Sequence, residues 1–175
     1  MIRVQSPDVT ALAQKLARVA GDAPTAFRRA AATVSRGGLT AAKRATTAIY
    51  NLPQRRVADD ISVSNDGLTV TITARKRAPT LAAYGGRMLR KGYAVTIRKD
   101  RGRVLLNRKV FTPPKFGGKP FERVGAARLP IRVLYGPSVA DMMNNELVFQ
   151  PLQAALIERG ANELDRLITR ELRNG

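Results

Sequence analysis

The residues best suited to chemistry in this sequence are lysines and arginines, and they gather in one segment. Residues 75–128 contain 16 basic and two acidic residues, a net charge of +14. Guanidinium and ammonium groups bind phosphates and carboxylates without reading a base sequence. The segment therefore predicts contact with a polyanion, either a DNA backbone or an acidic protein, and a merely solvated basic face stays open as a third interpretation. The candidate contact residues flank one expected turn and are Arg98, Lys99, Arg101, Arg103, Arg108 and Lys109.

No catalytic signature accompanies this charge. His and Cys are absent from the sequence, which removes the commonest general base, the thiol nucleophile and the usual transition-metal ligands. Asp59 and Asp60 are adjacent, so on a helix their side chains would diverge by about 100° and could not share a site as a catalytic acid pair does. We interpret them as a solvated helix end. We expect a protein that is not an enzyme and that uses no metal, no cofactor and no small-molecule substrate.

Composition narrows the expected partners further. The chain has 175 residues and a net charge of +18, and 44% of its residues are hydrophobic, which argues against wholesale disorder. Aromatic residues make up only 5% and Trp is absent, which disfavours a reader of single-stranded nucleic acid because such proteins stack bases on aromatic rings. No signal-like segment or apolar run of membrane length is visible. We expect one domain, residues 1–175, made in the cytoplasm and without membrane contact.

The first of three regions, residues 6–50, is Ala-rich and predicts a helical arm. Ser6 is expected to cap a helix that begins at Pro7. Gly21-Asp22 is expected to end it, and Gly37-Gly38 to kink a second helix or to separate two shorter ones. The small residues at helical spacing leave two interpretations open, close packing within the monomer or a subunit interface. The interface candidates are Phe27, Ala31, Val34, Ala41, Ala45 and Ile49.

The middle region, residues 52–137, predicts a basic, β-rich core. Asn65-Asp66-Gly67 is a strong hairpin turn between alternating apolar residues. A second hairpin is expected from strands at residues 93–97 and 104–111, and a last strand at residues 129–135. This hairpin would present the basic cluster around its tip.

The last region, residues 138–173, is helical again. Ser138 is expected to cap a short helix, and Pro151 is expected to begin the final one. The predicted fold class is therefore α+β, with a central antiparallel β-sheet, Ala-rich N-terminal helices and a C-terminal helix.

Two stretches resemble a known protein family. The first is the Ala/Arg-rich stretch from Ala26 to Leu52, and the second runs Arg-Leu-Pro-Ile-Arg-Val-Leu-Tyr-Gly-Pro-Ser-Val from Arg128 to Val139. With the β-rich middle between them, they resemble the minor tail protein Z family of tailed bacteriophages and prophages, over roughly Ala26 to Met143. The resemblance implies a tail-completion protein without catalytic residues. It also implies a structural motif formed by Arg128, Pro130, Ile131, Gly136, Pro137 and Ser138.

The resemblance leads to a specific expectation about function. We expect a structural virion protein at the head-proximal end of a phage tail, where it completes the tail and helps to join head and tail around the DNA channel. Because tail tubes are commonly six-fold, we expect a homo-hexameric ring. Its expected partners are other neck and tail proteins, together with sequence-independent contact with genomic DNA. The alternatives are a tail terminator that caps the tail tube and, in another class, a basic nucleic-acid-binding module.

Overall fold

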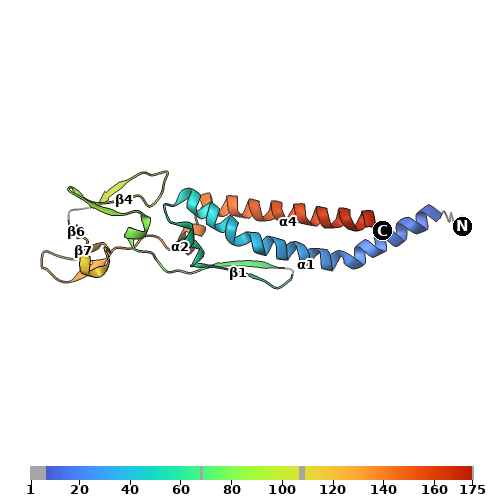
Figure 1. Cartoon of the computed structure of the whole chain (residues 1–175), viewed down its shortest axis with the longest axis horizontal. Helices are drawn as coiled ribbons and strands as arrows, with labels where there is room; N and C mark the ends of the chain where they lie inside the picture. Colours follow the sequence, from blue (N-terminus) through green and yellow to red (C-terminus); the bar gives the residue numbers. More distant parts are fainter. Residues whose placement is uncertain (1–6, 68, 107–108, 175) are drawn as a thin grey trace. The chain divides into compact units, whose positions relative to one another are not determined.

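The computed structural model describes residues 7–67, 69–106 and 109–174, so the predicted cap Ser6 and the predicted contact Arg108 lie outside the described residues. Long helices begin and end the described chain, and short strands lie between them in sequence (Figure 1). The helices are α1 (Pro7–Ile49), α2 (Gln54–Ala58), α3 (Val139–Met143) and α4 (Glu146–Asn174), with 3-10 helices η1 (Leu81–Tyr84) and η2 (Pro114–Phe116).

Within the described residues, the strands form three small antiparallel sheets. The strands are β1 (Ile61–Asn65), β2 (Val70–Ala74), β3 (Arg87–Leu89), β4 (Gly92–Val95), β5 (Val104–Leu106), β6 (Val110–Phe111), β7 (Phe121–Arg123) and β8 (Ile131–Val133). Their orders are β1-β2, β3-β4-β5 and β6-β7-β8. The predicted α+β class is confirmed, but the strands in the described part of the chain do not join into one central sheet. The strand expected at residues 104–111 is divided, because its first part pairs with β4 and its last part pairs with β7.

The β1–β2 hairpin forms at the predicted turn. The Asn65 side chain accepts a hydrogen bond from the Gly67 backbone N–H at 2.7 Å, and the Asp66 side chain accepts one from the Thr69 backbone N–H at 2.7 Å. Gly67 has a φ of 99°, a conformation that glycine adopts without steric cost. Asn and Asp are typical of turns because their side chains bond the nearby backbone in this way, and this preference is what predicted the turn from the sequence.

Helix α1 corrects the prediction that Gly21-Asp22 ends a helix, because the helix is continuous from Pro7 to Ile49. A helical glycine costs only about 1 kcal/mol relative to alanine, which the Ala-rich sequence around it can offset. Gly37 also stays helical, and its missing side chain makes room for a neighbour. A Cβ at this position would lie 1.6 Å from the Arg159 Nη1 atom of α4. The glycine therefore permits contact between two helices where the sequence suggested an interruption.

The chain divides into two compact units, and the first contains residues 1–38, 63–71 and 154–175. Within it α1 and α4 lie side by side (Figure 1). The Thr33 hydroxyl lies 3.5 Å from a Glu163 carboxylate oxygen, Gly160 lies against Val34, and Gly37 lies against Arg159. Because rising numbers in α1 meet falling numbers in α4, the two helices run antiparallel. Small residues at these contacts allow the close approach.

The second unit contains residues 39–62 and 72–153, and Tyr84 is central to its core. The Tyr84 side chain is fully buried, and its hydroxyl donates a hydrogen bond to the Pro137 carbonyl oxygen at 2.5 Å. Its ring lies against Gly136, where a Cβ would come within 2.4 Å of a ring carbon. Burial, reinforced by nearby Tyr50, raises the pKa of the Tyr84 hydroxyl. The phenol therefore stays protonated and remains a donor.

Helix α3 begins at the predicted cap. The Asp141 backbone N–H donates to the Ser138 Oγ atom at 3.2 Å, and the Ser138 backbone N–H donates to the Asp141 carboxylate at 3.1 Å. The Ser138 hydroxyl donates to the same carboxylate at 2.6 Å. These reciprocal bonds form a capping box.

Helix α4 begins earlier than predicted, at Glu146 and not at Pro151. The Asn145 side-chain oxygen accepts a hydrogen bond from the Leu147 backbone N–H at 3.1 Å, which satisfies one of the open donors of the first turn. Pro151 lies inside the helix, where it removes one backbone hydrogen bond. The Asn cap was the stronger start signal in this segment.

We expect Gly136→Ala to lower the free energy of unfolding by about 1–3 kcal/mol, because the added methyl group collides with the packed Tyr84 ring. Gly125→Ala is the matched control, since a Cβ there meets nothing within 4 Å and should change stability by less than about 1 kcal/mol. Urea unfolding followed by circular dichroism measures both. Equal effects of the two substitutions would contradict the packing role of Gly136.

A pH dependence follows from the capping box. Hydrogen bonds from Ser138 hold the pKa of the Asp141 carboxyl below its ordinary value. A lowered folded-state pKa stabilises the protein above the unfolded-state pKa of about 4, and this contribution is lost as the pH falls through the folded-state pKa. We expect the stability difference between the wild type and Asp141→Asn to shrink between neutral pH and acid, with Asp59→Asn, which removes the charge of an exposed carboxylate, as the control for a change in net charge. A constant difference for Asp141→Asn in unfolding titrations would refute this linkage.

Candidate functional site

The basic segment forms an exposed surface of the second unit. Every described basic residue between Arg75 and Arg128 is exposed except Arg98, which is partly buried. Charges on side chains that reach water are available to a polyanionic partner and are screened by salt. The positive charge seen in the sequence is therefore mostly presented at the surface.

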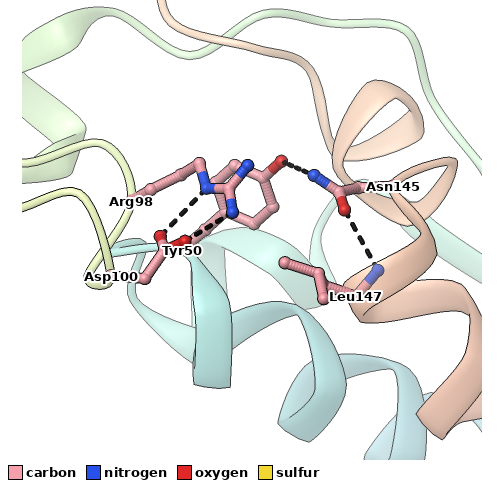
Figure 2. Close-up of polar contacts among 5 residues, drawn as sticks. All are labelled: Tyr50, Arg98, Asp100, Asn145 and Leu147. Carbon is pink, nitrogen blue, oxygen red and sulfur yellow. Dashed lines mark hydrogen bonds and ion pairs between the residues drawn. The ribbon is translucent and has the colours of Figure 1, made fainter.

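Arg98 is bound within the chain. Its Nε atom donates to Asp100 Oδ1 at 2.9 Å and its Nη2 atom to Asp100 Oδ2 at 2.5 Å, a bidentate pair (Figure 2). The hydrogen bonds from Arg98 hold the pKa of the Asp100 carboxyl below its ordinary value. The Arg98 backbone also forms an antiparallel bridge with Tyr50. Arg98 therefore shapes the connection between β4 and β5 and has only part of its charge to offer a partner.

Lys99 fastens the same connection to the last turn of α1. Its ammonium group donates to the Thr47 carbonyl oxygen at 2.5 Å, and its backbone N–H donates to the Ile49 carbonyl oxygen at 2.8 Å. A cation at this position is favourable because the carbonyl end of a helix carries partial negative charge. Lys99 thus acts as a cap of α1 in this structure.

Arg101 and Arg103 are the exposed pair of the predicted cluster. They flank Gly102, which has a φ of 69° and turns the chain toward β5. Lys109 is also exposed, but it directly precedes β6 and so belongs to a different sheet. The structure brings the residues from Arg98 to Arg103 together and divides them by role, since the first two hold the connection in place and the last two extend from it.

Hydrogen bonds of one tyrosine and two asparagines also help to hold the end of α1, and with it the β4–β5 connection, in place. The Tyr50 hydroxyl accepts a hydrogen bond from the Asn145 side-chain amide at 3.0 Å (Figure 2). Asn145 also caps α4 through Leu147. The Asn51 side chain donates to the Tyr84 carbonyl oxygen at 2.9 Å. The loop that bears the exposed arginines is therefore tied to the end of α1, which is itself tied to η1 and to the start of α4.

The motif from Arg128 to Ser138 contains residues of different character. Arg128 is exposed, and the Leu129–Pro130 peptide bond is cis. Ile131 begins β8. Gly136 and Pro137 contact Tyr84, and Ser138 caps α3. The last three positions therefore have roles in packing and in helix capping.

The stripe proposed as a subunit interface is used partly within the monomer. Ala31 is buried and Val34 lies against Gly160 of α4. Ala41, Ala45 and Ile49, in the second unit, are partly buried. Phe27 differs from the rest because 52% of its surface is exposed. Phe27 is the member of this stripe whose side chain is most available to another subunit.

The adjacent carboxylates correct the prediction of a solvated helix end at one of the two positions. Asp59 is exposed as expected, but Asp60 is only 2% exposed and lies 3.0 Å from the Arg56 guanidinium, without the alignment of a hydrogen bond. Asp60 turns inward because β1 begins at the next residue and its own carbonyl oxygen accepts the Arg75 backbone N–H.

Among the described residues, no group of three Asp, Glu, His or Cys side chains could hold a metal ion. None of the described helices is long and apolar enough to cross a membrane.

An aromatic groove is the feature that sequence reasoning missed. Phe111 and Phe121 are paired across β6 and β7, with ring centroids 6.2 Å apart, and Phe116 lies 5.3 Å from Phe121. The three rings come from a strand, a 3-10 helix and another strand. Their proximity depends on strand register, and the sequence showed only that aromatic residues were few.

No family model, curated protein or solved structure matches this chain. The assignment of a function therefore depends on the residues and on their geometry.

The division of roles within the basic cluster can be measured. We expect Arg98→Gln to lower the free energy of unfolding, because it removes the bidentate pair with Asp100. The double variant Arg101→Gln/Arg103→Gln should leave stability nearly unchanged and reduce the slope of log affinity for duplex DNA against log salt by about two. Urea unfolding and fluorescence anisotropy at several salt concentrations test both statements. A double variant that loses stability but keeps the salt dependence of its DNA binding would contradict this division of roles.

Proposed function

We propose that this protein is a structural virion component at the head-proximal end of a phage tail, where it completes the tail and helps to join it to the head. The observation that carries the proposal is the stretch from Arg128 to Val139, which, with the Ala/Arg-rich helix before it, resembles the minor tail protein Z family. The lack of His and Cys agrees with a role in assembly. The proposal includes no catalytic step and no cofactor.

The geometry supports this proposal at the motif itself. Gly136 has no space for a side chain beside Tyr84, and the Pro137 carbonyl accepts the Tyr84 hydroxyl. Ser138 then caps the next helix. Each position is constrained by packing or by hydrogen bonding, which is what a sequence motif without catalytic residues requires. The motif is thus suited to maintain a fold rather than to react.

The charge distribution suggests how such a protein would act. A ring of subunits, hexameric in our proposal, would place many exposed cations around the path of the genome. Strong attraction would slow DNA passage, so an arrangement in which most cations face acidic neck and tail proteins is favoured. Exposed charges in either position accelerate assembly because they steer oppositely charged partners together.

Two alternatives make different predictions. A tail terminator would cap the tail tube and stop its growth, so its loss would give tails of irregular length. A basic nucleic-acid-binding module would bind duplex DNA as a free monomer, with a steep salt dependence. The exposed arginines at 101 and 103 are the observation that favours the second alternative.

The placement is tested by electron microscopy of particles from the bacterium that carries the gene. We expect an antibody or a small fused tag to label one site per particle, at the junction of head and tail. We expect a disrupted gene to give separate heads and full-length tails. Tails of uncontrolled length would favour the terminator. Label at the distal tip, or none on mature particles, would overturn the proposal.

A further inference from the structure

The sheet formed by β6, β7 and β8 has one face that combines aromatic and basic side chains. Residues two apart in a strand share a face, so Phe121 and Arg123 of β7 lie together. The register places Phe111 beside Phe121 and Ile131 beside Arg123. Phe116, from the loop between β6 and β7, covers Phe121. The aromatic rings therefore form an apolar floor on this face, and the Arg123 cation lies beside it.

A groove of about 520 Å³ lies on this face, which is within the range of sites that bind small ligands or short peptide segments. Two of its apolar side chains are strongly exposed, Phe116 at 48% and Leu129 at 67%. Exposed apolar surface in a concave site stabilises a complex when a partner covers it. The groove is lined by Phe111, Pro113, Phe116, Arg123, Arg128, Leu129 and Ile131.

The charge of this groove is of one sign. Its charged lining residues are Arg123 and Arg128, and no acidic side chain is among the described residues that line it. The Arg123 guanidinium carbon lies 5.3 Å from the Phe111 ring centroid, which holds the cation beside the apolar floor. Glu122 points to the opposite face, where Arg132 binds it at 2.7 Å. An occupant of matching chemistry is therefore acidic and carries an apolar anchor.

The edge of the same sheet indicates which class of molecule would bind in the groove. β8 is an edge strand of the sheet in the part of the chain that the structure describes. The Leu134 N–H donates to Pro120, and the Pro130 carbonyl accepts from Val124, so even-numbered residues of this segment face β7. By alternation, the backbone N–H and C=O groups of Ile131 and Val133 point away from β7. These groups can pair with an added strand, a recognised mode of peptide binding.

We infer that this groove and the adjacent edge of β8 bind an extended acidic peptide segment of a partner protein. The segment adds a strand to β8 and inserts an apolar side chain between Phe116 and Leu129. Its carboxylates pair with Arg123 and Arg128. This inference goes beyond the proposed function, because it specifies a partner chemistry that would hold in any particle or assembly.

A nucleic acid fits the same features less well. Phosphates would pair with the two arginines, but the edge of β8 offers backbone groups in the alternating pattern of a strand, which a sugar-phosphate chain does not match. Stacking of successive bases needs several exposed rings. Of the two rings that line this groove, Phe116 is strongly exposed, whereas Phe111 is only partly exposed. The observations therefore favour a peptide.

The test uses the full chain and a designed probe, the peptide Glu-Asp-Val-Trp-Val-Asp-Glu. Because the chain contains no Trp, the fluorescence of the probe reports its own burial. Three further probes separate the contributions to binding: the amide peptide Gln-Asn-Val-Trp-Val-Asn-Gln, the acidic peptide N-methylated at every backbone amide, which blocks strand pairing in either direction, and a labelled oligodeoxythymidine. We expect saturable binding and a blue-shifted Trp emission for the first peptide, and at least about tenfold weaker binding for the amide and N-methylated peptides.

Matched variants separate the groove from the general charge of the protein. Arg128→Gln should weaken binding of the acidic peptide about tenfold, whereas Arg90→Gln, at an exposed position in the β3–β4 turn, should weaken it less than about threefold. Leu129→Ser should weaken it about tenfold or more, as loss of an anchor does, whereas Leu105→Ser, which alters another exposed leucine, should have no effect. Circular dichroism spectra confirm that each variant remains folded.

Three results would overturn the inference. Equal losses from Arg128→Gln and Arg90→Gln would mean that the peptide senses only the overall positive charge. Tighter binding of oligodeoxythymidine, lost in Phe116→Ser and Leu129→Ser, would mean that the groove binds nucleic acid. Undiminished binding of the N-methylated peptide would exclude strand addition. Each of these results leaves the placement of the protein in a phage tail unaffected, because that placement is tested on particles.

Discussion

The contact of Tyr84 with Gly136 and Pro137 is the interaction on which the second unit depends. Its hydroxyl bonds one backbone carbonyl and its ring occupies the space that a side chain at residue 136 would need. A buried phenol without an acceptor would be costly, so the bond and the packing reinforce each other. The contact fixes the chain as it leaves β8 and so determines where Ser138 begins α3. Tyr84 also accepts a hydrogen bond from Asn51, which joins this corner to the end of α1.

A second constraint comes from charge. A net charge of +18 on 175 residues raises the repulsion within the folded chain. The structure reduces it locally by directing some cations to internal acceptors, as with Arg98 on Asp100 and Lys99 on the carbonyl end of α1. The same contacts hold the β4–β5 connection in place. Stability and presentation of charge are therefore linked, since the cations nearest the backbone organise the loop and those at Arg101 and Arg103 extend from it.

Local signals in the sequence were sufficient for the parts of the fold that form by local interactions. The Asn65-Asp66-Gly67 turn and the Ser138 cap satisfy nearby backbone groups, so their residue types identified them. The groove could not be predicted in this way. Phe111, Phe116 and Phe121 meet through strand register, and register follows from the pairing of whole strands. The burial of Asp60 likewise depends on packing between distant segments. The continuity of α1 past Gly21 shows that a single glycine is only a weak local preference against a helix.

The combination of a charged surface and an apolar groove bears on specificity. Exposed arginines attract any polyanion, so charge alone does not distinguish an acidic protein from DNA. An apolar floor beside Arg123 adds an attraction that a phosphate backbone cannot satisfy. Because apolar contacts persist at salt concentrations that screen surface charges, the groove would retain a partner that the charges had only attracted. If the protein assembles beside a genome, as we propose, it needs such a difference, since the most abundant anion near it would otherwise compete for every exposed cation.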